Sequence, residues 1–169
     1  MLVENAILGA HIIWKVRPLK KAATQAAAKL ALQLDGNLSG SGSTNRKPTK
    51  DVTITSRGQN EWTVDLTYVS SRDTLNEELY ETFDKREELE LWRIDTATAT
   101  AGLECEATYV RGYLTSFELP DNVDDTVDGS TSIDVTYGPV KGTVTLTQDE
   151  INEIETAFEF VDTEPVEEG

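Results

Sequence analysis

The sequence predicts a mainly β (α+β) fold, an antiparallel β-sandwich of about eight strands with one flanking α-helix and a short C-terminal helix. Three observations predict it. Several runs alternate apolar and polar residues with a period of two, which is typical of strands with one buried face. Gly, Pro and Asn separate these runs and favour turns. Two Thr-x-x-Glu sequences precede apolar stripes of helical spacing, the pattern of a capping box at a helix start.

The first half of the chain is expected to supply four strands. Alternation is clearest over 61–70, where four large apolar side chains share one face and acidic and Thr side chains share the other. Gly58-Gln59-Asn60 is expected to turn the chain just before this run. The strands expected in this half are 9–17, 28–35, 51–57 and 61–70.

A helix is predicted over about 74–86. Thr74 and Glu77 form a capping box, and Lys85-Arg86 suit the negative end of the helix dipole. One apolar stripe follows the helical period, so the helix should lie against a sheet through Leu75, Leu79 and Phe83.

The second half should return to strands at 87–96, 103–119, 133–138 and 140–146, with Pro120 and Gly138-Pro139 ending two of them. In 87–96, apolar residues occupy both faces, so this strand is either covered on both sides or bulged near Leu91. A second capping box, Thr147 and Glu150, predicts a short helix to about residue 157.

Residues 36–50, GNLSGSGSTNRKPTK, are expected to be flexible, because their Gly and Ser content disfavours regular structure. The far side of this segment is basic, with Arg46, Lys47 and Lys50.

Length and charge suggest a single domain over 1–161 followed by an acidic tail at 162–169. The net charge of −16 is uneven: residues 1–60 hold nine Lys and Arg against three Asp and Glu, and residues 61–169 hold six against twenty-eight. A basic first third joined to an acidic remainder can favour head-to-tail association of copies, and the alternative interpretation is that the acidity simply keeps the protein in solution. The N-terminus lacks the basic start of a signal peptide and no window is as apolar as a membrane helix, so we expect a soluble protein made in the cytoplasm.

Signatures of an enzyme are missing from the sequence. It has no G-x-S-x-G, no phosphate-binding glycine loop, no CxxC and no HExxH, so we expect neither catalysis nor a cofactor. The one cysteine, Cys105, is expected to be a small core residue. Asp124-x-Thr126-x-Asp128-Gly129 imitates the start of a calcium-binding loop, but Val135 stands where a bidentate Glu is needed, so we expect an acidic turn without metal.

The stretch GYLTSFELPDNVDDTVDGSTSIDVTYGPVKGTVTL resembles the closing half of the major tail (tail tube) proteins of long-tailed, non-contractile siphophage-type bacteriophages. The opening segments IIWKVRP and AAKLALQ, and ELELWRID in the middle, resemble the same family in the same order. The resemblance spans most of residues 9–161.

This resemblance implies six copies in a ring, joined edge to edge, with rings stacked into a virion tail assembled in the host cytoplasm. It also implies a tape-measure protein inside the tube and terminator and distal tail proteins at its ends. The 36–50 loop would reach the neighbouring ring, with contacts at Gly36, Ser39, Ser41, Arg46, Lys47 and Lys50.

Double-stranded DNA must pass through such a tube without being held. A basic lining would accumulate phosphate contacts, whereas an acidic lining repels the polymer and leaves it free to slide. Strand alternation suggests five acids for this lining: Glu61, Asp65, Glu104, Glu106 and Asp134.

Two alternatives stay open at this point. One is a monomeric β-sandwich module of the carbohydrate-binding or adhesin type, with a platform of Trp62, Trp92, Tyr109 and Tyr113. The other is a tube subunit of a contractile or type VI secretion system.

Overall fold

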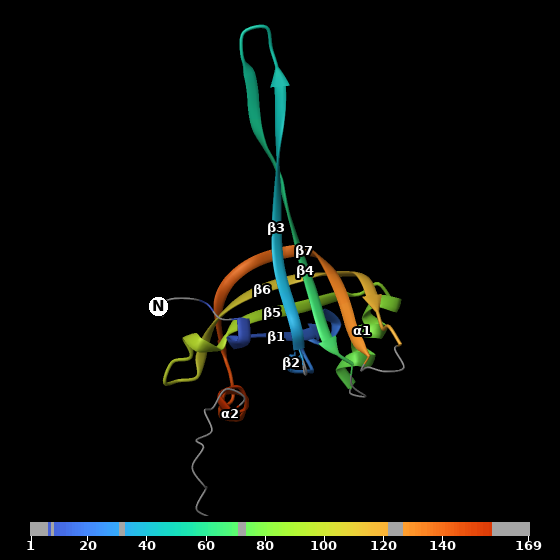
Figure 1. Ribbon diagram of the computed structural model, residues 1–169, viewed down its shortest axis with the longest axis vertical. Coiled ribbons are helices and arrows are strands. Elements are labelled where there is room, and N and C mark those ends of the chain that lie inside the picture. Colours follow the sequence, from blue (N-terminus) through green and yellow to red (C-terminus); the bar gives the residue numbers. More distant parts are fainter. Residues whose placement is uncertain (1–6, 8, 31–32, 71–73, 122–126, 157–169) are drawn as a thin grey trace, which may run out of the picture.

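The computed structural model describes residues 7, 9–30, 33–70, 74–121 and 127–156. These residues form one seven-stranded antiparallel sheet in the order β2-β1-β5-β6-β7-β4-β3 (Figure 1). The strands are β1 (Ile12–Pro18), β2 (Ala28–Lys29), β3 (Gln33–Pro48), β4 (Thr53–Val69), β5 (Glu88–Asp95), β6 (Glu104–Glu118) and β7 (Asp128–Thr145). The helices are α1 (Thr74–Asp84) and α2 (Gln148–Thr156), with 3-10 turns at Gly9–His11, Leu19–Lys21 and Thr96–Thr98.

The mainly β antiparallel class is confirmed, but the sandwich is wrong, because a single sheet curls until its two ends touch. The backbone N–H of Trp14 on β1 donates to Gln33 Oε1 on β3 at 3.2 Å. A Cβ placed on Gly36 of β3 would lie 2.4 Å from the Trp14 indole nitrogen. The curled sheet therefore encloses the core that a second sheet would otherwise cover.

The strand count differs because two expected turns do not interrupt the chain. Gly58-Gln59-Asn60 lies inside β4, and Gly138-Pro139, joined by a cis peptide bond, lies inside β7. Pairing of β7 with β4 ends at Asp134, so Pro139 has a neighbouring strand on one side only, where a missing N–H is tolerated. The expected strand 28–35 instead supplies parts of two strands, β2 and β3.

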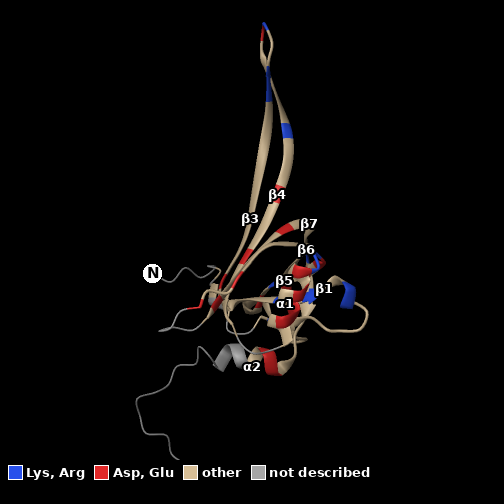
Figure 2. Cartoon of the chain, turned by 90° about the vertical axis from the view of Figure 1, so that its right-hand side faces the viewer, with Lys and Arg blue, Asp and Glu red and all other residues tan. Residues whose placement is uncertain are grey.

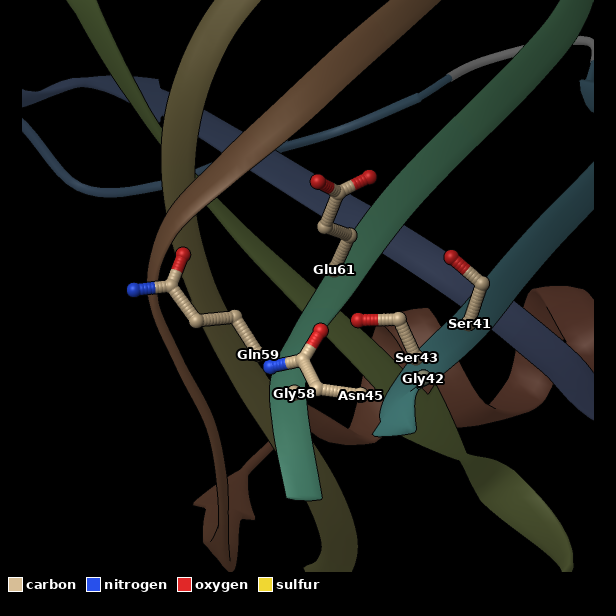
Figure 3. Close-up of a pocket in the computed structure, with 7 residues that line it drawn as sticks. All are labelled: Ser41, Gly42, Ser43, Asn45, Gly58, Gln59 and Glu61. Carbon is tan, nitrogen blue, oxygen red and sulfur yellow. The ribbon is translucent and has the colours of Figure 1, made fainter. Parts of the chain in front are cut away.

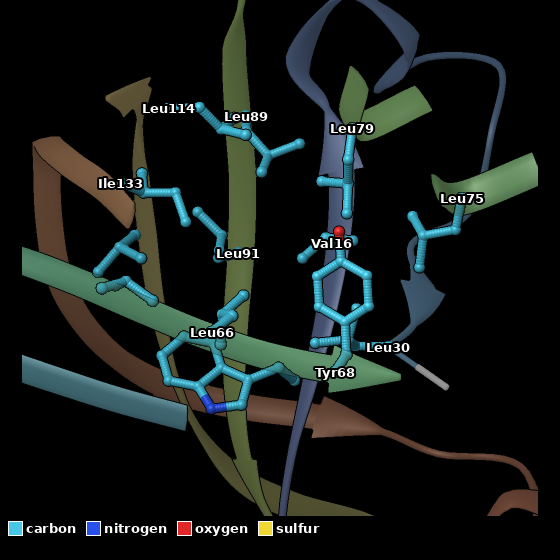
Figure 4. Packing of buried hydrophobic residues seen from close by; sticks show 13 residues of the cluster. Val16, Leu30, Leu66, Tyr68, Leu75, Leu79, Leu89, Leu91, Leu114 and Ile133 are labelled. Atoms are coloured by element: carbon cyan, nitrogen blue, oxygen red, sulfur yellow. The ribbon is translucent and has the colours of Figure 1, made fainter. Parts of the chain in front are cut away.

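The main core lies inside the curl (Figure 4). Strands from both ends of the sheet meet there, with Val16 from β1 and Leu66 from β4, while β5 contributes Leu91, which has no exposed surface. Helix α1 closes this core: Leu75 and Leu79 are buried and Phe83 packs against the cluster, which confirms the predicted amphipathic helix.

A smaller core lies on the opposite face of the sheet under α2. Its buried members are Ile13, Ile94, Cys105, Ala107, Leu146 and Ile151. Strand β5 thus has a core on each face, and its ladders with β1 and β6 show no register shift. Of the two alternatives for this strand, coverage on both sides is confirmed and a bulge near Leu91 is wrong. The expected capping box is present: Glu150 N–H donates to Thr147 Oγ1 at 3.2 Å, and Thr147 N–H donates to Glu150 Oε2 at 3.1 Å.

Some expectations fall outside the described residues, namely the tail 162–169, most of the N-terminal arm 1–8, and the start of the calcium-like turn at Asp124. Across the part of the chain that is described, no three His, Cys, Asp or Glu side chains are placed to share a metal ion. None of the described helices is long and apolar enough to cross a membrane.

Candidate functional site

The most prominent feature outside the core is a long hairpin formed by β3 and β4 (Figure 1). Its ladder runs from the Gln33–Tyr68 pair to the Pro48–Thr53 pair. The lower part of β4, 63–69, also pairs with β7, but the upper part, 53–62, pairs with β3 alone. All residues from 39 to 57 are exposed, so the upper hairpin has no core of its own.

The expectation that 36–50 lacks regular structure is wrong, because most of this segment is β3. Cross-strand pairing overrides the weak strand propensity of Gly and Ser. Gly40 also serves packing, since a Cβ there would lie 2.8 Å from the Trp62 ring. The hairpin ends in a turn in which the Thr49 N–H and hydroxyl both donate to the Val52 carbonyl, at 2.9 and 2.5 Å.

A shallow hollow of about 310 Å³ marks the middle of the hairpin, at the register shift between Gly42 and Thr44 (Figure 3). Gly58 is needed there because a Cβ would lie 2.0 Å from Ser43 Oγ and 2.7 Å from its carbonyl oxygen. The lining consists of Ser41, Gly42, Ser43, Asn45, Gly58, Gln59 and Glu61. With one charged residue, Glu61, and no nucleophile–base pair, this hollow suits polar contact with another surface rather than catalysis.

The outer part of the hairpin is basic and its base is acidic (Figure 2). Arg46, Lys47 and Lys50 gather near the tip, and Arg57 on β4 joins them. Sequence reasoning missed Arg57, because 51–57 was expected to be a separate strand of the body. These four cations make no ion pair with any described residue.

The six residues expected to contact the next ring do not form one patch. Only the three basic ones are at the tip. Ser39 and Ser41 lie midway along β3, and Gly36 lies at its base against Trp14.

Three of the five candidate lumen acids share one face of the sheet. Asp65 and Asp134 lie on neighbouring strands, where Asp134 pairs with Thr63 and Asp65 pairs with Ser132. Glu61 is on the same face by the period-two alternation of β4, and all three are exposed. Ser132 Oγ donates to Asp65 Oδ1 at 2.5 Å, and no described cation pairs with the three carboxylates.

Glu104 and Glu106 lie on the other face. They alternate along β6 with Cys105 and Ala107, which point into the small core under α2. The structure therefore separates the five acids into two groups, which strand alternation within each run could not reveal.

The four aromatic residues of the expected sugar platform are also divided. Trp62 lies on the main-core face by alternation with Val64, whereas Trp92, Tyr109 and Tyr113 lie on the α2 face. The Trp92 and Tyr109 rings are 5.3 Å apart and inclined at 47°, so they do not form a flat surface.

Two of these aromatics, Trp92 and Tyr109, belong to a network around a buried carboxylate. Glu90, 6% exposed, accepts hydrogen bonds from Arg17 Nε at 2.7 Å and from the Tyr109 hydroxyl at 2.6 Å. Burial, together with this contact to Glu90, raises the pKa of Tyr109. Arg17 also stacks on Trp92, so the network joins β1, β5 and β6 on one face.

Comparison with known proteins agrees with this fold. The family of phage tail tube proteins matches residues 6–141. The chain is similar to the SPP1 tail tube structure, with a TM-score of 0.70 and 19% identity over 94% of this chain and 88% of that one. It is also similar to a chain in the tail of an empty GTA particle refined with C6 symmetry, with a TM-score of 0.62 and 11% identity over 84% of this chain and 100% of that one.

A chain from the baseplate of the anti-feeding prophage gives a TM-score of 0.55 at 5% identity, over 85% of this chain and 98% of that one. No relative was found among curated proteins. The family match covers most of the sheet and the whole hairpin, and this chain therefore belongs to the phage tail tube protein family.

Proposed function

We propose that this chain closes into rings of six copies that stack into a tail tube, through which double-stranded DNA passes. The observation that carries the proposal is the hairpin of β3 and β4, which has open edges and no core in a single copy. A two-stranded ribbon is at best marginally stable alone in water, so a partner is needed to hold it. The sixfold symmetry of the similar GTA tail supports the ring number.

Stacking of rings would use the basic tip of the hairpin. Arg46, Lys47, Lys50 and Arg57 are exposed and unpaired in the described structure. Residues 61–169, which hold twenty-eight Asp and Glu against six Lys and Arg, would supply acidic partners in a copy of the next ring. Because translation along the axis never closes on itself, this contact would extend the rings into a filament.

Only one of the two groups of acids can line the bore if one face of the sheet is turned toward it. We assign Glu61, Asp65 and Asp134 to the bore, because their face is opposite the main core and they have no cationic partner. Glu104 and Glu106 would then lie away from it. An assembled tube with the first three on its outer wall would contradict this assignment.

The role is structural rather than enzymatic, and the protein would be made in the host cytoplasm before joining the virion. A tape-measure protein inside the tube and terminator and distal proteins at its ends are the further partners proposed. The similarity to anti-feeding prophage chains reflects a shared fold. We favour the DNA-conducting tube over a contractile or secretion tube because the family match is to phage tail tubes.

Light scattering after size-exclusion chromatography, followed by negative-stain microscopy, tests the proposal. We expect rings or tubes at high protein concentration. A strictly monomeric protein under all assembly conditions would contradict it, and binding of glycans by that monomer would favour the carbohydrate-binding alternative.

A further inference from the structure

Two arginine–aromatic stacks lie side by side on the α2 face of the sheet. In the first, the guanidinium carbon of Arg17 lies 5.1 Å from the centroid of the Trp92 ring. In the second, the guanidinium carbon of Arg111 lies 4.4 Å from the centroid of the Tyr137 ring. Tyr109 lies between the stacks, with its ring centroid 5.3 Å from that of Trp92 and 6.2 Å from that of Tyr137. Because the two stacks share one aromatic cluster, their polar partners can be compared directly.

The first stack is complete within one copy. Arg17 Nε donates to Glu90 Oε2 at 2.7 Å, and Arg17 Nη1 donates to the Gln25 carbonyl at 3.1 Å. The other oxygen of the Glu90 carboxylate accepts from the Tyr109 hydroxyl at 2.6 Å. Both oxygens of this buried carboxylate are therefore engaged by Arg17 and Tyr109.

The second stack lacks a carboxylate. Arg111 lies directly opposite Glu90 in the ladder of β5 and β6, but it forms no ion pair with Glu90 or with any other described residue. Its Nε is buried and has no hydrogen-bond partner. A guanidinium stays charged, and leaving one of its buried donors without an acceptor is unfavourable. The fold of one copy therefore leaves Arg111 without the kind of partner that Arg17 has.

The side chains next to Arg111 are exposed. Tyr137 is 49% exposed, and Val140, which pairs with Tyr109 across β6 and β7, is 46% exposed. β4 stops pairing with β7 at Asp134, so beyond that point the side of β7 away from β6 has no described neighbouring strand. We name Arg111, Tyr137 and Val140 the Arg111 patch. Arginine and tyrosine are the residue types enriched at the centres of protein interfaces.

A second copy of this chain fits the Arg111 patch by charge. Residues 61–169 hold twenty-eight Asp and Glu against six Lys and Arg, so a neighbouring copy brings many carboxylates and few cations. The position of the patch gives a second reason. Asp134 lies opposite Tyr113, two residues along β6 from Arg111, on the face assigned above to the bore. A carboxylate on Arg111 would neutralise a cation beside the path of the DNA.

We propose that the Arg111 patch binds a carboxylate side chain of a neighbouring copy in the assembled tube. Arg111 would then receive from another chain the partner that Arg17 finds within its own. The planar guanidinium matches a carboxylate with two parallel N–H···O bonds, and Tyr137 and Val140 would exclude water from the pair. The proposal rests on the tube assembly proposed above and names one contact within it.

Carbodiimide coupling of tubes made from the Arg111→Lys variant tests this contact. The variant keeps the positive charge but replaces the unreactive guanidinium with an amine. A carbodiimide joins such an amine to a touching carboxylate as an amide, and it takes up the released water to become a urea. Tubes are assembled from equal amounts of isotope-labelled and unlabelled copies, so that mass spectrometry separates links between copies from links within one copy.

We expect links between copies that join position 111 to an Asp or Glu. Tubes that form normally but link position 111 only within one copy, to Glu90 for example, or not at all, would overturn the contact and leave the tube proposal intact. Failure of the parent protein to form rings or tubes would instead contradict the proposed function.

The protein concentration needed for assembly gives a second test, which also applies if Arg111→Lys does not assemble. Arg111→Gln removes the charge, should leave the urea midpoint of the monomer close to that of the parent, and should raise this concentration by at least about 10-fold. An unchanged concentration for Arg111→Gln would overturn the contact.

Lys141→Gln is the matched control. It removes the same charge from an exposed position one residue beyond Val140, on the opposite face by alternation along β7. It should change the concentration needed for assembly by less than about 3-fold, because an exposed charge outside a contact contributes little. Equal increases for Arg111→Gln and Lys141→Gln would mean that only the net charge matters, and would overturn the proposal.

Discussion

Strand β4 shows two environments within one strand. Its lower part, 63–69, pairs on both sides and places Val64, Leu66 and Tyr68 in the core. Its upper part, 53–62, pairs on one side and buries no residue. The comparison indicates that the body is stabilised by its own core, whereas the upper hairpin has no core of its own, which fits the contacts with neighbouring copies proposed above.

The largest effect on folding is expected from the body. Leu91→Ala removes a side chain with no exposed surface and should lower the free energy of unfolding by about 2–5 kcal/mol. Ile54→Ala in the hairpin is the matched control, and it should change the free energy of unfolding of the monomer by at most about 0.5 kcal/mol. Urea denaturation followed by circular dichroism measures both. Equal losses would mean that the hairpin contributes to the monomer core.

Replacing Glu90 should lower the free energy of unfolding by a somewhat smaller amount. Glu90→Ala leaves the Arg17 guanidinium and the Tyr109 hydroxyl without the acceptor that they share. The free energy of unfolding should fall by about 2–3 kcal/mol as a result. Glu61 is an exposed acid on the hairpin and serves as the control. Glu61→Ala should change the free energy of unfolding of the monomer by less than about 0.5 kcal/mol. If Glu90→Ala unfolds at the same urea concentration as the parent, the buried network does not stabilise the body.

Glu150 at the start of helix α2 should contribute about 1 kcal/mol to the free energy of unfolding, and this contribution should depend on pH. Burial alone would raise the pKa of Glu150, but hydrogen bonds from Lys15 and the Thr147 backbone, with the charges of Lys15 and Lys29, outweigh it and lower the pKa. A carboxyl with a lowered folded-state pKa stabilises the fold above its unfolded pKa of about 4.3, and this contribution is lost as the pH falls through the folded value.

Glu150→Gln should therefore be less stable than the parent at pH 7, and the difference should shrink below about pH 4. Denaturation midpoints from pH 3 to 7 measure it. Asp149→Asn, on the same first turn but exposed, is the control. A difference that is unchanged down to pH 3 would exclude the charge of Glu150 as the cause.

Trimming the hairpin should have the smallest effect on the fold, although it should abolish assembly. Replacing residues 43–59 with Asn-Gly joins Gly42 to Asn60, which are paired in the ladder, through a favoured two-residue turn. We expect the body to unfold at nearly the parent urea concentration and to remain monomeric by light scattering. Normal rings from this variant would contradict a role of the hairpin in assembly.

Alternation of apolar and polar residues along the sequence was sufficient to predict strands where every second side chain is buried. It predicted β1, β5, β6 and the lower part of β4, and the apolar stripe and capping boxes predicted both helices. It could not show that a single curled sheet covers its own core, because a buried face looks the same whether a second sheet or the same sheet covers it.

The hairpin was missed for a different reason. The propensities of Gly and Ser describe a chain without a partner, whereas β3 is formed by its pairing with β4 and by glycines that allow close approach, such as Gly40 against Trp62. The separation of Glu104 and Glu106 from Asp65 and Asp134 likewise depends on how β6 and β7 align, which includes register shifts that no local pattern reveals.

Amide hydrogen exchange, compared between monomer and assembled tube, tests the difference between body and hairpin most directly. In the monomer, we expect amides of 63–69 to be strongly protected and those of 36–45 and 53–62 to exchange rapidly. In the tube, protection of the hairpin amides should rise by at least about 100-fold as neighbouring copies cover the hairpin. Hairpin amides that are as protected in the monomer as those of 63–69, or that gain no protection in the tube, would contradict the view that neighbouring copies hold the hairpin in place.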